Sequence, residues 1–342
     1  MAFYFLINGQ QMYEFSAEQT NKSRILAFSR PTLQKPEAIA YLCSSTFTTR
    51  LMKKEKTIRL IYPQWQGAMV EGLLPELCPA DASRGYSLGA QLLNFLAPEN
   101  SGQETLTVPV SMEYGKRMIQ DGVADRDIIL RQSEAALAML RAAAPDKIIT
   151  LGGECSVSVV PFTYLAHKYR GDIAMIWIDA HPDITLPGDV YPGYHAMAAA
   201  ACMGKGDERI LSVLPARIAA ERILMVGLRD WERDEIRVRQ KEFGIRHLTA
   251  EEVRADSQAV CEWLGGCGAT RVVVHFDMDV LDPAEIIPAV GVVRDGLKMA
   301  EAVRIINDIG REKEIVGLTV AEPMPRIAIR LKKMLEELPL MR

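Results

Sequence analysis

Three potential metal ligands alternate along the sequence as Asp179, His181 and Asp183. In extended backbone, residues two and four positions apart point the same way, so these side chains can converge on one point. Two carboxylates and an imidazole on one face repel or desolvate one another unless a positive charge lies between them. A divalent cation meets this need, and the spacing therefore predicts a metal site.

A buried strand would carry this cluster to the edge of a sheet. Residues 173–178 are all apolar, which is typical of a strand in a parallel sheet, and Pro182 fits a chain that then leaves the sheet. Further strands are predicted at 57–62, 106–110, 147–151, 222–226, 271–276 and 315–320, and helices at 127–144, 251–263 and 298–309. This alternation predicts an α/β fold with three layers, α/β/α, in which helices cover both faces of a central parallel sheet.

Polar groups also follow three other predicted strands. Asp277 and Asp279 follow one of them and share a face by the same period of two. A Gly-Gly-Glu-Cys-Ser turn that contains Cys155 follows a second strand, and Glu322 follows a third. Because parallel sheets place their sites at the C-terminal ends of strands, we expect these groups to meet at a common rim.

The composition is that of an ordinary globular protein, with 342 residues and 49% hydrophobic side chains. A formal net charge of −4 gives no electrostatic case for binding nucleic acid or an anionic membrane. The six cysteines form no Cys-x-x-Cys pair, no secretory signal is visible, and no stretch approaches the roughly 18 apolar residues of a membrane span. We therefore expect a cytoplasmic protein with reduced thiols.

The two ends of the chain differ from its middle. Residues 1–51 are rich in Ser, Thr, Gln and Asn without a sustained period, and we expect a poorly structured extension, with Met52 as a candidate natural start. A short cap that packs on the domain is the rival interpretation. Residues 52–342 form the predicted catalytic domain. Near the C-terminus, apolar residues at helical spacing between 331 and 338 are expected to pack on the domain or on a neighbouring subunit.

Five motifs occur in a characteristic order along residues 57–325. They are Gly-Gly-Glu-Cys-Ser at 152–156, Asp-Ala-His-Pro-Asp at 179–183, Tyr-His-Ala-Met at 194–197, His-Phe-Asp-Met-Asp-Val-Leu-Asp-Pro at 275–283 and Ala-Glu-Pro-Met-Pro at 321–325. This order resembles the ureohydrolase family, which contains arginases, agmatinases and related guanidino-acid hydrolases. The resemblance implies an arginase/deacetylase-like fold.

The resemblance also implies a pair of metal ions. By position, Asp179 and Asp277 would each bridge the two metals. Asp183 would complete site A, and His181 and Asp279 would complete site B. Four carboxylates offset the repulsion between two close dications, and a hard, oxygen-rich ligand set suits two Mn²⁺ ions.

The implied reaction is hydrolysis of a linear amidine by a metal-activated hydroxide, with release of urea. A guanidinium carbon is a poor electrophile, so a strong nucleophile held against it is what the reaction needs. By resemblance, Glu322 would hold the substrate guanidinium, His195 would shuttle protons to solvent, and Asp183 would help to protonate the leaving amine.

Cys155 stands where the family has the first histidine ligand of site A. It can be a thiolate ligand that favours Zn, Fe or Ni, a non-ligand beside a single-metal amidohydrolase site, or a buried thiol. A covalent Cys–His mechanism is a further alternative, because the turn resembles a nucleophile elbow, but Val157 stands where that motif has Gly. A catalytically impaired relative with a regulatory or structural role also remains open.

The positions that contact the amino-acid end of the substrate in arginases also hold different residues in this sequence. Thr185, Tyr191 and Glu232 occupy them, and Thr185 and Glu232 can still contact a substrate. The partner is therefore a small guanidino or amidine molecule whose identity stays open. His275 stands where the family often has Ser, and we expect a buried neutral histidine or a group behind the ligands. The resemblance further implies a homo-oligomer, a trimer or a hexamer.

Overall fold

The computed structural model describes residues 2–7, 11–16, 55–100 and 102–341, in two units that divide after Lys53. In the first unit, β1 (Ala2–Ile7) and β2 (Gln11–Ser16) pair in an antiparallel hairpin that the sequence did not predict. The rest of the predicted extension, residues 17–51, and the boundary at Met52 lie outside the described residues. The assignment of two domains therefore stays a prediction.

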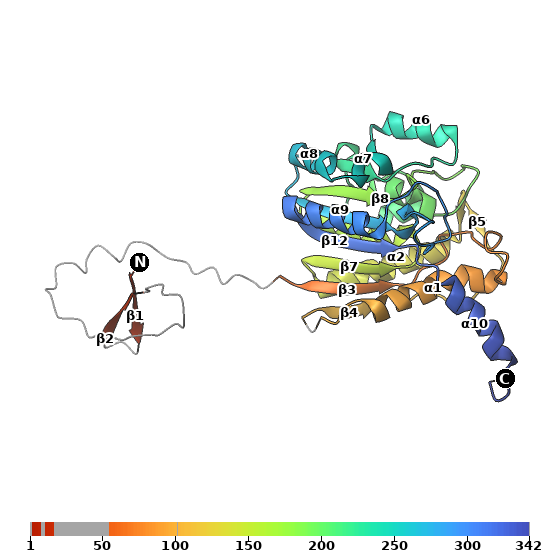
Figure 1. Ribbon diagram of the computed structural model, residues 1–342, viewed down its shortest axis with the longest axis horizontal. Coiled ribbons are helices and arrows are strands. Elements are labelled where there is room, and N and C mark those ends of the chain that lie inside the picture. The colour runs from red at the N-terminus through yellow and green to blue at the C-terminus, as the bar shows by residue number, and fades with distance from the viewer. Residues whose placement is uncertain (1, 8–10, 17–54, 101, 342) are drawn as a thin grey trace. The chain divides into compact units, whose positions relative to one another are not determined.

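The second unit is built on an eight-stranded sheet in the order β10-β9-β8-β11-β12-β7-β3-β4 (Figure 1). All its neighbouring strands pair in parallel. The strands are β3 (Thr57–Tyr62), β4 (Glu104–Thr107), β7 (Lys147–Gly152), β8 (Ile173–Ile178), β9 (Ile223–Val226), β10 (Arg246–Leu248), β11 (Arg271–Asp277) and β12 (Glu314–Ala321). A small antiparallel pair is formed by β5 (Ile119–Gln120) and β6 (Val123–Ala124). The predicted parallel sheet is confirmed.

Helices cover both faces of this sheet. They are α1 (Pro79–Leu96), α2 (Arg126–Ala143), α3 (Val159–Lys168), α4 (Ala198–Cys202), α5 (Glu208–Val213), α6 (Asp234–Phe243), α7 (Ala250–Arg254), α8 (Gln258–Gly266), α9 (Met299–Glu312) and α10 (Arg326–Glu337). Strand β8 shows why there are two apolar layers. Met175 and Trp177 join the core formed with α2 to α4, whereas Ile176 and Ile178 join the core formed with α7 to α9. The three-layer architecture is confirmed.

Three elements differ in detail from the predicted ones. The strand expected at 106–110 lies at 104–107, ahead of Pro109, which has no backbone N–H to donate to a ladder. The helix expected at 251–263 is divided into α7 and α8 around Asp256. Strand β10 was missed because it is very short and only Leu248 in it is apolar, which gives no readable alternation.

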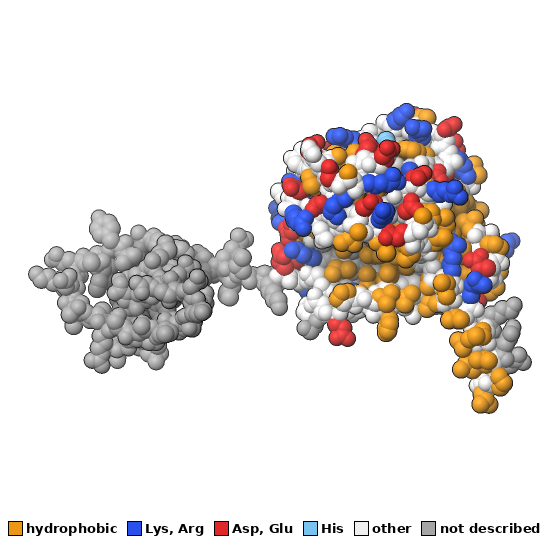
Figure 2. Space-filling model, in the orientation of Figure 1, with side chains coloured by type: hydrophobic (Ala, Val, Ile, Leu, Met, Phe, Trp, Pro, Cys, Tyr) orange, Lys and Arg blue, Asp and Glu red, His pale blue; other side chains and the backbone are white. Residues whose placement is uncertain are grey.

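The C-terminal helix α10 extends from the body of the second unit (Figure 1). Ile329 is buried against the core near α1, but Ile327, Leu331 and Met334 are at least half exposed (Figure 2). The expected packing on the domain is therefore limited to the start of this helix. None of the helices in the described ranges is long and apolar enough to cross a membrane.

Candidate metal centre

The four central strands β8, β11, β12 and β7 are consecutive neighbours in the sheet, and each ends at the same cavity. The cavity encloses about 290 Å³. The predicted site residues on its wall are Cys155, His181, Asp183, Thr185, His195, Glu232, Asp277, Asp279 and Glu322. Asp179 lies directly behind them. One carboxylate oxygen of Asp179, one ring nitrogen of His181 and one carboxylate oxygen of Asp279 lie within 4.8 Å of one another. The common rim expected from the sequence is therefore present.

The turn after β7 holds Cys155 in a fixed place. A Cβ atom on Gly153 would lie 1.8 Å from the backbone oxygen of Gln64, so only glycine fits there. Glu154 caps the short 3₁₀ helix Cys155–Ser158 by accepting the backbone N–H of Ser156 at 2.8 Å. It also accepts the Gln64 side-chain N–H at 2.7 Å. Glu154 is thus structural, and its bonds aim Cys155 at the cavity.

The loop after β8 carries the first ligand cluster. Asp179 accepts hydrogen bonds from the His181 backbone N–H at 2.6 Å and from the indole N–H of Trp177 at 3.0 Å. The Nδ1 atom of His181 lies 2.8 Å from an Asp279 oxygen. Asp183 has a φ of 47°, so the backbone is no longer extended where the sequence argument assumed a period of two. The three side chains nevertheless converge, because the bend turns Asp183 toward the same centre.

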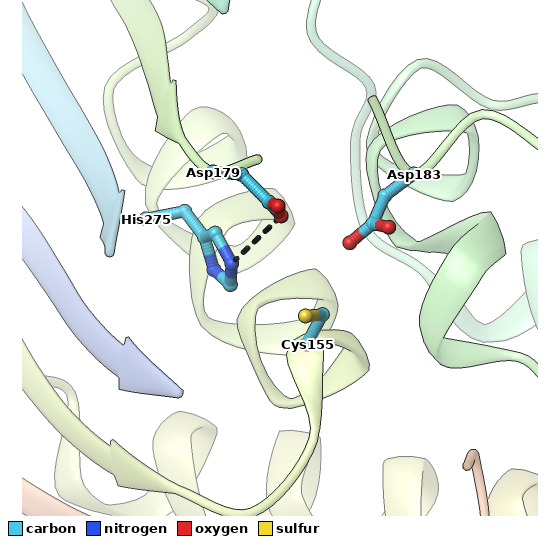
Figure 3. Close-up of side chains that lie close together, drawn as sticks. All are labelled: Cys155, Asp179, Asp183 and His275. Carbon is cyan, nitrogen blue, oxygen red and sulfur yellow. Dashed lines mark ion pairs between the residues drawn. The ribbon is translucent and has the colours of Figure 1, made fainter. Parts of the chain in front are cut away.

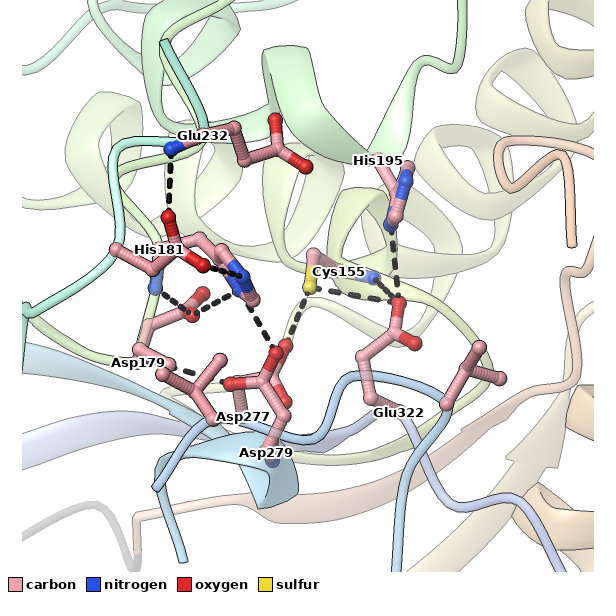
Figure 4. Close-up of polar contacts among 12 residues, drawn as sticks. Cys155, Asp179, His181, His195, Glu232, Asp277, Asp279 and Glu322 are labelled. Atoms are coloured by element: carbon pink, nitrogen blue, oxygen red, sulfur yellow. Dashed lines mark hydrogen bonds and ion pairs between the residues drawn. The ribbon is translucent and has the colours of Figure 1, made fainter. Parts of the chain in front are cut away.

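The end of β11 supplies the opposite wall. The backbone N–H of Asp279 donates to Asp277 Oδ1 at 2.7 Å, and the backbone N–H of Ala180 donates to Asp279 Oδ1 at 3.2 Å. The Cys155 thiol donates to Asp277 Oδ2 at 2.8 Å, which joins the β7 turn to β11. Figure 4 shows five of the predicted metal ligands close together: Cys155, Asp179, His181, Asp277 and Asp279. The sixth, Asp183, lies beside Cys155 and Asp179 (Figure 3).

The ionised carboxylates are unfavourable in this buried cluster, and a bound cation would offset their repulsion. Burial, together with neighbouring carboxylates, raises the pKa of Asp179 to about 7 and those of Asp183 and Asp277 well above their ordinary values. Burial also opposes ionisation of Asp279, but the nearby His181 lowers its pKa to about 2. One imidazole does not balance four buried acids.

The donor set fits divalent cations. Oxygen, nitrogen and sulfur ligands are all available, and the buried Asp183 Oδ2 and His275 Nε2 have no hydrogen-bond partner among the described residues. A buried polar atom without a partner is uncommon in a folded protein and calls for an explanation such as a bound ion. Asp179, His181 and Asp279 form one potential ligand group, and Cys155, Asp179, Asp183 and His275 form another.

Glu322 lies on the far side of Cys155 from the metal ligands (Figure 4). Its Oε1 atom accepts the Cys155 backbone N–H at 3.2 Å and lies 3.2 Å from His195 Nδ1, and its Oε2 atom accepts the hydroxyl of Tyr86. A φ of 63° places this glutamate in the left-handed region, which is unusual for a residue with a side chain. Several bonds thus hold an unusual backbone conformation that points a carboxylate into the cavity.

The three positions expected to read the substrate all lie near the cavity. Thr185 donates its hydroxyl to the Ala196 carbonyl at 2.7 Å, so only its lone pairs face a ligand. Tyr191 bonds to His195 Nε2 at 2.8 Å, which orients the imidazole. Glu232 is exposed at the cavity wall with a φ of 58°. Substrate contacts by Thr185 and Glu232 stay predictions.

Cys155 lies in surroundings that oppose a covalent role. Burial and the charges of Asp183 and Asp277 raise its pKa well above the ordinary value. Glu322 and Tyr191 already occupy the two nitrogens of His195, so His195 is not placed as a base for this thiol. A thiolate here requires a cation, as the ligand interpretation assumes.

The sequence contains no sign of Tyr86, and it predicted for His275 either a buried neutral histidine or a group behind the ligands. Tyr86 comes from α1, 236 residues from Glu322, and no local motif marks it. His275 did carry a signal, because it precedes Asp277 by two residues in a strand. It is fully buried, and desolvation lowers its pKa to about 3, which agrees with the expected neutral histidine.

Comparison with known proteins first defines the fold. The structure superimposes on crystalline Entamoeba histolytica arginase, solved in complex with L-ornithine, with a TM-score of 0.67 over 83% of this chain and 98% of that chain, at 21% identity. The architecture is therefore that of the arginases. The model of the arginase family matches residues 102–334, and the chain belongs to this family.

Sequence relatives have more than one named activity. The arginase of Entamoeba histolytica is 28% identical over 187 residues, which cover 53% of this chain and 62% of the relative. An N(1)-aminopropylagmatine ureohydrolase of Thermus thermophilus is 30% identical over 195 residues, which cover 56% of this chain and 59% of the relative. The matched segment thus spans about three fifths of these relatives, and the activity of this chain is a separate question.

Proposed function

We propose that this protein hydrolyses a C–N bond of a guanidino or amidine substrate and, from a guanidine, releases urea. The main observation in its favour is that the buried carboxylate of Glu322 lines the same cavity as His181, Asp183, Asp277 and Asp279, with Cys155 between Glu322 and the metal ligands (Figure 4). A planar cation held by Glu322 has its carbon beside the place where the aspartates would hold metal. The family membership and the named relatives support the same class of reaction.

Asp179, Asp183, Asp277, Asp279 and His181 would hold a pair of divalent cations. When bound, the cations would supply an activated water as the nucleophile of the hydrolysis. The arginase resemblance favours manganese in an all-oxygen and imidazole set, and the sulfur of Cys155 extends the candidates to Zn, Fe and Ni.

The chain's own groups would orient the substrate and move protons. Glu322 would accept the guanidinium N–H groups, and Tyr86 holds the second oxygen of Glu322 so that the carboxylate cannot rotate. His195 lies between the cavity and the outside, with 21% of its side chain exposed, which suits a proton relay. Asp183 also lines the cavity, where it would help to protonate the departing amine, as the family resemblance implies.

The charges on the cavity wall favour a substrate with a second positive charge. Glu232 adds a carboxylate, and neither lysine nor arginine occurs among the described residues that line this cavity. A substrate carboxylate would find no lysine or arginine among these lining residues, whereas an amine would meet Glu232. Apolar side chains such as Leu73 and Ile236 would cover a methylene linker. We therefore place guanidino-amines ahead of amino acids such as arginine.

We further propose a cytoplasmic location and a homo-oligomer, a trimer or hexamer, on the strength of the family resemblance. The exposed apolar residues of α10 are consistent with a contact between subunits. A catalytically impaired relative and a single-metal amidohydrolase are less well supported, because all the residues proposed for a binuclear hydrolase converge on one cavity.

The direct test is a panel of guanidines and amidines with purified protein of known metal content. Urea or ammonia should form with bound metal, cease after dialysis against a chelator, and return when Mn²⁺ or Zn²⁺ is added. An alkylating agent should not mimic the chelator, which separates this reaction from a covalent cysteine mechanism. A protein that binds no divalent metal and releases neither product would rule the proposal out.

Replacing Glu322 by Gln should reduce kcat/KM by roughly a hundredfold or more, because an uncompensated charge on the substrate costs about 3 kcal/mol. Gln keeps the shape and can still accept from Tyr86, so the metal content should not change. Steady-state kinetics together with elemental analysis checks both expectations. The matched control is Glu232→Gln at the exposed end of the cavity, where the loss should be below about tenfold. Equal effects of the two changes would argue against the proposed guanidinium position.

A further inference from the structure

The imidazole of His275 is fixed in one orientation. It lies on β11 and is fully buried. Its ring stacks on the indole of Trp177 with 3.7 Å between centroids and 11° between planes. Its Nδ1 atom lies 2.7 Å from the hydroxyl oxygen of Ser158. The ring therefore has one open nitrogen, Nε2, and packing determines where that atom points.

The Nε2 atom has no hydrogen-bond partner in the described part of the chain and points toward Asp179, with 3.9 Å to the nearer carboxylate oxygen (Figure 3). That distance is too long for a hydrogen bond. An unsatisfied buried polar atom destabilises a fold, and a role in packing alone would leave this loss uncompensated. When Ser158 accepts the Nδ1 proton, Nε2 presents a lone pair. A ring that is bonded at one nitrogen and open at the other is the usual arrangement of a metal-binding histidine.

Four donor atoms surround the same point. One atom each of Cys155, Asp179, Asp183 and His275 lies within 4.8 Å of the other three, and all four residues are buried (Figure 3). Metal bonds of about 2.0–2.3 Å in a tetrahedron separate the ligands by roughly 3.3–3.8 Å, so an inward shift of about 1 Å suffices. Asp183 Oδ2 likewise lacks a partner among the described residues. Two open donors from different segments thus face one centre.

We propose that His275 is a ligand of site A and replaces the imidazole absent at position 155. Site A then binds its cation through sulfur, nitrogen and two carboxylates, contributed by Cys155, His275, Asp179 and Asp183. This inference rests on the metal centre of the proposed function. The imidazole has moved from the turn after β7 to β11, and sulfur has been added. Such a soft, four-ligand set selects Zn²⁺, Fe²⁺ or Co²⁺ over Mn²⁺ at this position.

The test compares His275→Asn with His275→Gln. The Asn amide can keep the bond to Ser158 but removes Nε2, whereas the Gln amide reaches the place of Nε2. In the wild type, elemental analysis should find two divalent cations per chain, and Co²⁺ should give a thiolate charge-transfer band that Cys155→Ser abolishes. His275→Asn should lose one cation, or bind it more than a hundredfold more weakly, while His275→Gln should retain part of the affinity. The exposed His167→Asn should match the wild type.

A group behind the ligands would behave differently, since its loss costs only roughly 10–100-fold in affinity and leaves the spectrum unchanged. Two cations and an unaltered Co²⁺ spectrum in His275→Asn would therefore overturn the proposal. X-ray absorption of the zinc-loaded wild type needs no variant to fold. We expect a sulfur ligand at one metal and an imidazole ligand at each of the two metals. A single imidazole for two metals would contradict the proposal. A wild type that binds two metals but lacks hydrolysis would overturn only the proposed function, whereas binding no metal would end both.

Discussion

Replacing Asp277 by Asn is expected to abolish hydrolysis almost completely, with a fall in kcat/KM of at least about a thousandfold. Asp277 is buried at the cavity wall, and its Oδ2 atom accepts the Cys155 thiol at 2.8 Å. A carboxylate in that place would bind metal, as the family resemblance implies. Loss of the several kcal/mol of charge stabilisation that metals supply gives the expected factor. Kinetics and elemental analysis should show that activity and metal content fall together.

The same change should leave the metal-free fold intact or make it more stable. Burial and the neighbouring Asp279 and Asp179 raise the pKa of Asp277 well above its ordinary value, which shows that its charge is unfavourable without a cation. Thermal melts with chelator present should therefore place the Tm of Asp277→Asn at or above that of the wild type. Asp256→Asn, at an exposed position between α7 and α8, is the control and should alter neither property. A variant that keeps two metals and full activity would remove Asp277 from the centre.

The sheet and its acidic rim could be predicted because they depend on local patterns. Strands 57–62 and 173–178 agree with the structure residue for residue. The second is a continuous apolar run, which is typical of a buried parallel strand. The rim followed from the rule that parallel strands end at one edge. The rim positions of Asp179 and Asp277 could be predicted from the sequence alone, because each residue comes at the end of its strand.

What could not be predicted depends on long-range contacts or on backbone bends. Tyr86 meets Glu322 only through the packing of α1 near the end of β12, and no spacing in the sequence encodes that contact. Asp183 was expected to follow extended backbone, but it adopts a left-handed conformation. The open Nε2 atom of His275 became visible only when Trp177 and Ser158 were known to fix the ring.

The second large effect concerns pH. Without metal, the protein should lose stability as the pH rises from 5 to 8. Burial raises the pKa of Asp179 from 3.8 to about 7, so the folded state holds a proton that the unfolded state has released. The resulting stabilisation is complete below the unfolded pKa and disappears as the pH passes through 7. The loss over this range is about 3 kcal/mol for this one group.

Other groups of the cluster do not reverse this direction. His181 also has a raised pKa: burial opposes the shift, but Asp279 and Asp179 outweigh it, so its contribution is likewise lost at higher pH. Asp279, with a pKa of about 2, is ionised in both states throughout this range. Denaturant unfolding of the chelated protein at several pH values should show the decline. Asp179→Asn should flatten it.

Bound metal should turn this dependence around. A cation displaces the proton from Asp179 and then holds the ionised carboxylate, so its binding strengthens as the pH rises. The difference in Tm between metal-loaded and metal-free protein should therefore widen from pH 5 to pH 8. A constant difference, or a metal-free protein that becomes more stable over this range, would show that the aspartates are not crowded together in solution. The crowded carboxylates that destabilise the metal-free protein are therefore the same groups that favour binding of a dication.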